Sequence, residues 1–108
     1  MTITEFLLAR IEEDEDAARG VNRLLWNSRV ALLDHDLYGL VSRHHPDRVL
    51  AECRAKRAIV ELYDDSLKEQ IERRDASALG AGLMLDDVIR ALAAVHVDHP
   101  DYRKEWRV

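Results

Sequence analysis

The chain has 108 residues, a length that fits a single domain over residues 1–108 with one modest core. Charged residues make up 34% of it, Gly occurs four times and Pro twice, and the formal net charge is −5. Scarce Gly and Pro argue against a turn-rich β-sandwich, and the lack of a strongly basic segment argues against direct nucleic-acid contact. No apolar run approaches the ~20 residues that span a bilayer, so no membrane partner is expected.

The first 20 residues are predicted to form a helix. Thr2 and Glu5 have the spacing of a capping box, and Gly20 is a natural C-terminal stop. Apolar residues recur every three or four positions, at Ile3, Phe6, Leu7, Ile11 and Ala18. This periodicity is typical of an amphipathic helix with one face in the core.

Five consecutive acidic residues, the acidic cluster, lie late in this helix: Glu12, Glu13, Asp14, Glu15 and Asp16. The acidity of the chain is concentrated here, because its first 20 residues hold six acidic and two basic side chains. The helix dipole favours cations at this end. The cluster is therefore either a solvated face or a surface that binds a basic partner.

Residues 21–44 are ambiguous. They fit a helix capped by Asn27 or Ser28, or a short β-hairpin with Asp34, His35 and Asp36 at its turn. Short apolar runs do not separate the two, and Gly39 weakens both. The absence of Asn-Gly and Asp-Gly favours the helix.

Residues 46–75 give the clearest pattern, a long amphipathic helix of up to ~28 residues and ~40 Å. Its apolar stripe is Val49, Cys53, Val60, Leu67 and Ile71, in steps of 4, 7, 7 and 4. Such length implies a bend near residues 63–66, or antiparallel or dimeric packing. Arg57 and Asp64 interrupt the stripe, so no coiled coil is predicted.

A linker and a third strong helix are predicted next. Residues 76–82 are mostly small and include two glycines, which suits a turn between helices. Residues 83–97 form the helix, with Asp86 and Asp87 in its first turn. Its core-facing residues are Leu85, Val88, Ile89, Leu92 and Val95 or His96. The predicted fold is mainly α, a small helical bundle built on one long amphipathic helix.

The tripeptide His-Pro-Asp occurs twice, at His45, Pro46 and Asp47 and at His99, Pro100 and Asp101. Proline fits the first position of a helix, and an acidic residue after it is stabilised by the unpaired N–H groups. The first copy is predicted to start the long helix, and the second a helix of one or two turns ending at Trp106. Tyr102 and Trp106 would share a face of this short helix. They are anchors either in the protein's own core or for a partner or second subunit.

Catalytic chemistry has little support. His44, His45, Asp47, His96 and His99 could hold a metal if their two segments met, but their spacing matches no metal motif. Cys53 lies at a core position without a polar partner, and no serine has a nucleophile elbow. We assign no catalytic residue, cofactor or metal, and keep a metal-dependent enzyme using the His and Asp residues near 44–47 and 96–101 as the alternative.

Three blocks of sequence are familiar as a set. They are Phe6, Leu7, Arg10, Glu13, Asp14, Glu15, Ala18 and Arg19; then residues 43–46, 48–52, 55–57 and 59; then residues 98–102, Glu105 and Trp106. In these blocks the chain resembles a family of small uncharacterised proteins of actinobacteria and their phages and prophages. The resemblance implies an accessory protein without known activity. It also implies a partly strand-like segment between the first two blocks, where residues 21–42 look more helical.

The sequence therefore predicts a small acidic helical accessory protein that binds another protein or itself without catalysis. The partner-binding candidates are the acidic cluster together with Tyr102 and Trp106. The lone cysteine fits a reducing cytoplasm, that of the host cell if a phage encodes the protein.

Overall fold

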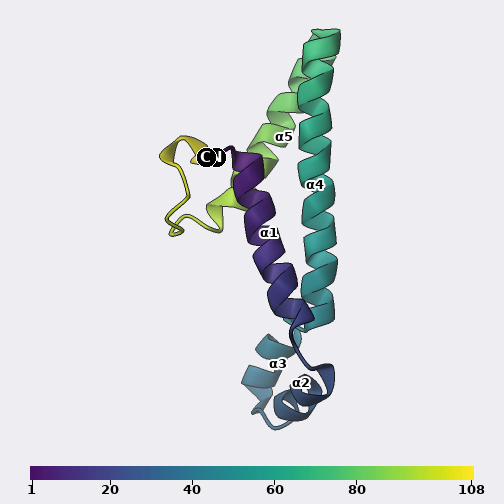
Figure 1. Ribbon diagram of the computed structural model, residues 1–108, viewed down its shortest axis with the longest axis vertical. Coiled ribbons are helices and arrows are strands. Elements are labelled where there is room, and N and C mark those ends of the chain that lie inside the picture. The colour runs from purple at the N-terminus through teal and green to yellow at the C-terminus, as the bar shows by residue number, and fades with distance from the viewer.

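The computed structural model describes residues 1–108 and contains helices and no β-strand, so the predicted mainly-α class is confirmed. Figure 1 shows the elements: α1 (Ile3–Arg19), α2 (Arg23–Val30), α3 (His35–Ser42), α4 (Pro46–Arg73), α5 (Ala76–Ala94) and the 3-10 helix η1 (Lys104–Trp106). Thr2 and Glu5 form the predicted capping box of α1, and Gly20 ends the helix with its N–H bonded to the Asp16 carbonyl.

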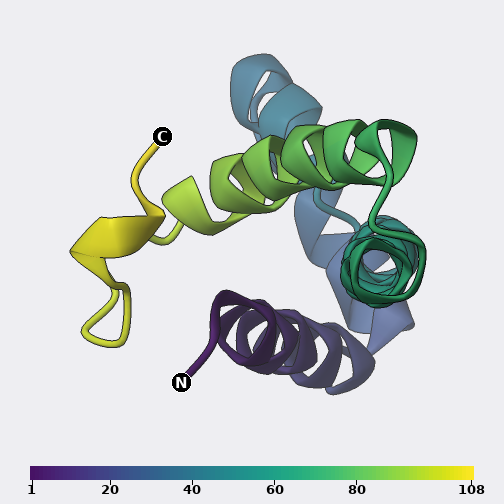
Figure 2. The same cartoon turned by 90° about the horizontal axis from the view of Figure 1, so that it is seen from above.

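Helix α4 is the axis of the molecule. Pro46 occupies its first turn, and the His45 Nδ1 accepts the Asp47 N–H at 3.0 Å, so the first His-Pro-Asp starts the long helix as predicted. The helix runs unbroken for 28 residues, without a break near Tyr63. Helices α1 and α5 both run antiparallel to it and pack on two of its sides (Figure 2). Of the predicted ways to accommodate its length, antiparallel packing is the one observed.

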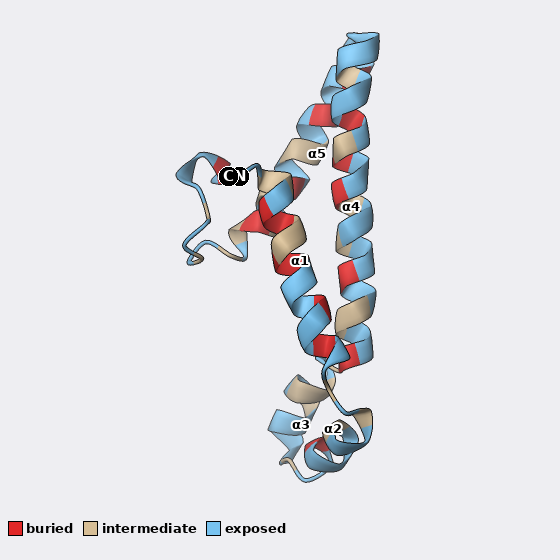
Figure 3. Cartoon of the chain, in the orientation of Figure 1, coloured by how far each residue is buried: buried red, intermediate tan, exposed pale blue.

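The core lies where α1, α4 and α5 meet (Figure 3). Phe6 and Leu7 of α1 and Ile89 of α5 are buried there with Cys53 and Val60 of α4. These buried residues confirm the predicted apolar stripes over the part of each helix that lies where the three helices meet. The cysteine is a free thiol, and burial raises its pKa, which leaves it in the unreactive protonated form.

The outer half of the α4 stripe is exposed, contrary to the prediction. Leu67 is 39% and Ile71 70% accessible to solvent. The physical reason is coverage: α1, at 17 residues, is too short to cover a 28-residue helix along its whole length. On α5, Val88 was predicted to face the core and is 42% accessible. Of the predicted alternatives Val95 and His96, His96 packs against Phe6, whereas Val95 is 78% accessible.

The predicted linker at residues 76–82 is wrong, because these residues form the first turns of α5. The connection is only Arg74, in the left-handed conformation with φ 52°, and Asp75, whose carboxylate accepts the Ala78 N–H at 2.7 Å. The small residues serve close helix packing instead. A Cβ on Gly82 would lie 1.6 Å from the Gln70 Nε2, so glycine is what lets Gln70 lie against α5. Asp86 and Asp87 consequently lie well inside the helix.

Residues 21–44 form two short helices rather than a hairpin. Asn22 caps α2 and Asp34 caps α3, each accepting a backbone N–H at 3.0–3.1 Å. The predicted caps Asn27 and Ser28 lie inside α2 instead. Asp34, His35 and Asp36 begin a helix where the hairpin interpretation needed a turn. Side-chain capping favours this outcome because it satisfies the first N–H groups locally.

The second His-Pro-Asp makes a turn and does not start a helix. His99 Nδ1 accepts the Asp101 N–H at 3.0 Å, the same local hydrogen bond that His45 makes. Only three residues, Lys104–Trp106, become helical after it. The motif therefore fixes the turn, and the following chain decides whether a helix continues.

The molecule is elongated, with extents of 56 × 24 × 23 Å and a Cα radius of gyration of 17.5 Å. A compact domain of this length would have a radius of about 13 Å. None of the helices combines the length and the apolar character needed to cross a bilayer.

Candidate binding surfaces

The acidic cluster is divided by the fold. Glu15 points inward, 6% accessible, and accepts two hydrogen bonds from the Arg57 guanidinium, one of them from Nε at 3.0 Å. These hydrogen bonds lower the pKa of Glu15 and raise that of Arg57. Glu15 is thus part of the α1–α4 contact and is not available to a partner.

The other four acidic residues of the cluster are exposed: Glu12, Glu13, Asp14 and Asp16. Glu13 pairs with Arg10 at 3.1 Å, and Asp16 with Arg19 at 3.7 Å, both within α1. The second pair is exposed on both sides and adds little stability, whereas Arg10 in the first pair is buried. Four carboxylates therefore remain exposed on this face of α1, which both interpretations of the cluster require.

Sequence reasoning did not identify Arg57 as the residue that pairs with Glu15. It was recognised only as an interruption of the α4 stripe, as was Asp64, which accepts the Thr4 hydroxyl hydrogen at 3.3 Å. Both charges lie on the stripe because they face α1. The burial of Glu15 could have been predicted from the sequence, because Glu15 lies four residues after Ile11 and three before Ala18, on the buried face of α1.

The C-terminal aromatic residues pack inside the protein. Trp106 is 8% accessible and its ring centroid lies 5.1 Å from that of Phe6. Tyr102 packs edge-on against both rings, at 6.0 Å from Phe6 and 5.6 Å from Trp106. Arg90 of α5 donates to the Glu105 carbonyl at 2.7 Å. These contacts hold the tail against α1 and α5. Of the two predicted roles for these aromatic residues, the structure therefore shows packing in the protein's own core.

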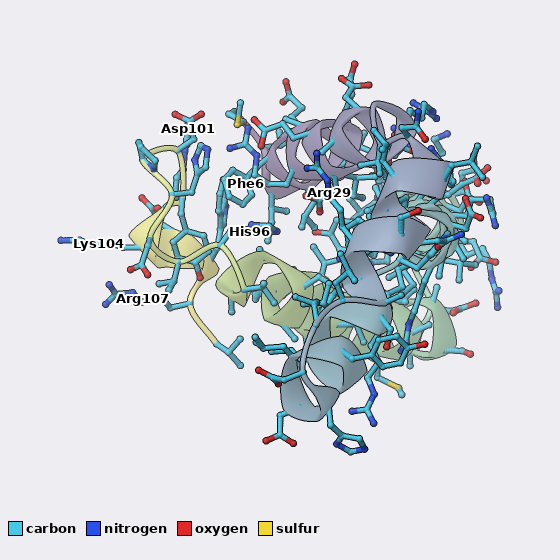
Figure 4. All side chains as sticks on the ribbon, turned by 90° about the horizontal axis from the view of Figure 1, so that it is seen from below. Phe6, Arg29, His96, Asp101, Lys104 and Arg107 are labelled. Carbon is cyan, nitrogen blue, oxygen red and sulfur yellow. The ribbon has the colours of Figure 1, made fainter.

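Two histidines complete the aromatic cluster. His96 and His99 lie edge-on to the Phe6 ring, at 6.0 and 5.5 Å. In Figure 4 Phe6 and His96 lie between α1 and the tail, whereas Lys104 and Arg107 point away from it. Burial lowers the pKa of His96. The guanidinium of Arg10 stacks at 5.3 Å from the Phe6 centroid and is buried, with its Nε and Nη1 unpartnered.

The two histidine segments do not meet. His45 lies at the start of α4, edge-on to Trp26 at 6.1 Å, and Asp47 pairs with Arg23 at 3.1 Å. His96 and His99 lie beside Phe6, near the other end of α1 (Figure 1). No group of three or more His, Cys, Asp or Glu side chains is placed to hold a metal ion. The first His-Pro-Asp thus anchors α2 to α4. The residues that the metal-dependent alternative would need as ligands are divided between the start of α4 and the aromatic cluster around Phe6.

Most of the exposed large apolar side chains lie in two regions. On α2 and α3 and their connection, they are Leu24, Leu25, Leu32, Leu37, Tyr38 and Leu40, all at least 48% accessible. Beyond the end of α1, the hairpin of α4 and α5 exposes Leu67 and Ile71 on one helix and Leu79, Leu83, Met84 and Val88 on the other. Sequence reasoning had assigned Leu67, Ile71 and Val88 to the protein's own core.

A family model, described as "Family of unknown function (DUF6221)", matches residues 1–108. No curated protein and no solved structure matches the sequence. Because the family match spans the whole chain, the protein belongs to this family of unknown function.

Proposed function

We propose that this member of a family of unknown function is a small acidic binding protein that acts by contact with another protein or with its own copies, without catalysis. The observation that carries the proposal is the imbalance between core and surface. The main core holds nine buried residues, whereas large apolar side chains such as Leu24, Leu32 and Ile71 are 70–86% accessible. Extensive apolar exposure of this kind marks interaction sites in proteins.

The four exposed carboxylates of the acidic cluster supply the electrostatic part of the same proposal. They would orient a partner that carries basic groups, and their contribution would weaken as salt screens it. Trp106 does not serve as a contact residue in this proposal, because its ring is in the protein's own core.

The biological setting is proposed from the resemblance alone. The three blocks of sequence described above resemble proteins of actinobacteria and their phages and prophages, which supports an accessory role in that context. A cytoplasmic location is proposed from the single free cysteine, Cys53, which is buried and unpaired.

Site-specific photo-cross-linking in the cell that naturally makes the protein tests the proposal. A photoreactive phenylalanine derivative would replace Leu24 or Ile71, with exposed, charged Glu61 as the matched control position. We expect a discrete cross-linked product, with this protein or another, from at least one apolar position and none from Glu61. The absence of a discrete product at both apolar positions would contradict the proposal.

A further inference from the structure

We propose that a groove between α1 and the start of α4 binds an arginine side chain of a partner protein, which would contact the indole of Trp26 and the carboxylate of Asp14. The inference rests on the proposed binding function and assigns a site and a ligand chemistry to it. Three features of the molecule carry it: the place where α5 ends, the residues that line the groove, and the ion pairs around it.

The groove lies where α1 and α4 continue beyond the end of α5 (Figure 1). Near its end, α5 places Leu92 and Val95 in a small cavity with Asp14 of α1 and Lys56 of α4. Helix α4 begins ten residues before Lys56, about 15 Å away along its axis. Over this distance a groove of about 260 Å³ lies between α1, α2 and α4, and we call it the α1–α4 groove. Its lining residues are Asp14, Ala17, Ala18, Val21, Trp26, His44, Pro46 and Val49.

Helical spacing shows that the α1–α4 groove continues the side on which α5 packs. Val49 lies seven residues before Lys56 and therefore on the same side of α4. On α1, Ala17 and Ala18 follow Asp14 by three and four residues, and Asp14 lines both the groove and the small cavity at the end of α5. The groove is thus the part of the α1–α4 junction that α5 does not reach.

The wall of the α1–α4 groove suits both the stem and the head of an arginine side chain. Val21, Val49 and the two alanines are apolar, and an arginine stem packs on such surface. The half-buried indole of Trp26 offers the aromatic ring that attracts cations most strongly, and a planar guanidinium stacks on it. The volume is below the ~300–1,000 Å³ of pockets for drug-sized ligands, which favours a single side chain over a cofactor.

Asp14 supplies a carboxylate that the protein itself does not use. Its neighbours in the acidic cluster each pair with an arginine: Glu13 with Arg10, Glu15 with Arg57 and Asp16 with Arg19. Asp14 is exposed and forms no hydrogen bond or ion pair with another side chain, although Lys56 lines the small cavity on its α5 side. An unpaired carboxylate beside an indole is complementary to a cation and not to an anion.

The other charges around the α1–α4 groove do not oppose a cation. Arg23 pairs with Asp47 of α4 at 3.1 Å, so its charge is compensated. The same guanidinium donates to the carbonyls of Ala18 and Val21 at 3.1 and 2.8 Å, which fixes α2 against α1 and α4. His44 adds an imidazole that in its neutral form offers an acceptor nitrogen. The groove is therefore held in place before a partner arrives, which lowers the cost of binding.

NMR titration of the ¹⁵N-labelled full chain at pH 7.5 with N-acetyl-arginine amide tests the inference. We expect saturable shifts of the Trp26 indole N–H and of the Ala17 and Val21 amides, with half-saturation on the order of millimolar for so small a ligand. The Trp106 indole, buried in the core, is the internal control and should not shift. N-acetyl-citrulline amide, the neutral counterpart of the arginine derivative, should bind several-fold more weakly.

Two variants separate the α1–α4 groove from the acidic face as a whole. Asp14→Asn is expected to weaken binding of the arginine derivative about three- to fivefold, the effect of one exposed ion pair. Glu12→Gln removes the same charge from an exposed residue of the cluster that does not line the groove, and should stay within about twofold of the wild type. Both side chains are exposed, so the fold should persist, and far-UV circular dichroism checks this.

Saturable shifts at Trp26 that need the guanidinium and Asp14 would support the inference. Absence of saturable shifts, or equal binding of the citrulline derivative, would overturn it. Equal weakening in Asp14→Asn and Glu12→Gln would assign the attraction to the whole acidic face and would overturn it too. The proposed binding function is tested separately by the cross-links at Leu24 and Ile71, which do not line this groove.

Discussion

Phe6 is the residue around which the tail is organised. Its ring contacts those of Trp106, Tyr102, His96 and His99 within 5.1–6.0 Å. Aromatic pairs at such distances add stability beyond the area that they bury. The C-terminal tail is therefore part of the core although it is almost entirely without regular structure.

Replacing Trp106 with alanine is expected to lower the free energy of unfolding by about 3–5 kcal/mol, because it removes a buried ring from this cluster. Urea denaturation followed by circular dichroism measures the change. Trp26→Ala is the matched control: Trp26 is only half-buried, against His45, so its loss should cost clearly less. Equal losses for the two variants would contradict the placement of Trp106 in the core.

His96 makes stability depend on pH. Burial lowers its pKa below the ordinary 6.5, so the unfolded chain takes up this proton more readily than the folded one. The contribution of neutral His96 is complete above that ordinary value and is lost as the pH falls toward the lowered pKa.

We therefore expect the urea midpoint to fall between about pH 7.5 and 5.5, and to fall less in His96→Gln. His35→Gln, at a fully exposed side chain, should keep the wild-type pH dependence. An unchanged slope in His96→Gln would show that another group controls stability in this range.

At the scale of elements, the α4–α5 hairpin depends on close approach rather than on a long linker. Gly82 allows Gln70 to lie against α5, whereas a Cβ on Gly80 would have no neighbour within 4 Å. Both glycines lie inside α5, where glycine costs helix stability compared with alanine.

Gly80→Ala is therefore expected to raise the free energy of unfolding by about 0.5–1 kcal/mol, since nothing opposes the added methyl group. Gly82→Ala should gain less, because the Gln70 side chain must move to admit it. Chemical denaturation of the two variants side by side measures the difference. A larger gain at Gly82 than at Gly80 would contradict the packing seen here.

At the scale of the whole molecule, the shape follows from unequal helix lengths. The radius of gyration, 17.5 Å, exceeds the ~13 Å of a compact domain because α4 extends past α1 at the tip, and α2 and α3 lie at its other end. An elongated chain with a small core gains stability from whatever covers its exposed apolar sides.

Sequence reasoning predicted the features that depend on neighbouring residues. The capping box of Thr2 and Glu5, the start of α4 at Pro46 and the inner stripe residues Phe6 and Val60 were all identified correctly. Errors occurred where one pattern fits two structures. Glycines suited a turn as well as close helix packing, and His-Pro-Asp suited a turn as well as a helix start.

Local interactions in the sequence by themselves determined the all-α class, the helix caps and the long helix, because capping and periodicity act within a few residues. Only the tertiary structure decided which apolar residues are buried and which acidic residue is paired. Cys53 and Leu67 lie on one stripe, yet only Cys53 lies beneath α1. Glu15 is withdrawn from its cluster by Arg57, 42 positions away in the sequence. Burial and pairing depend on where another helix begins and ends, and no local pattern records that position.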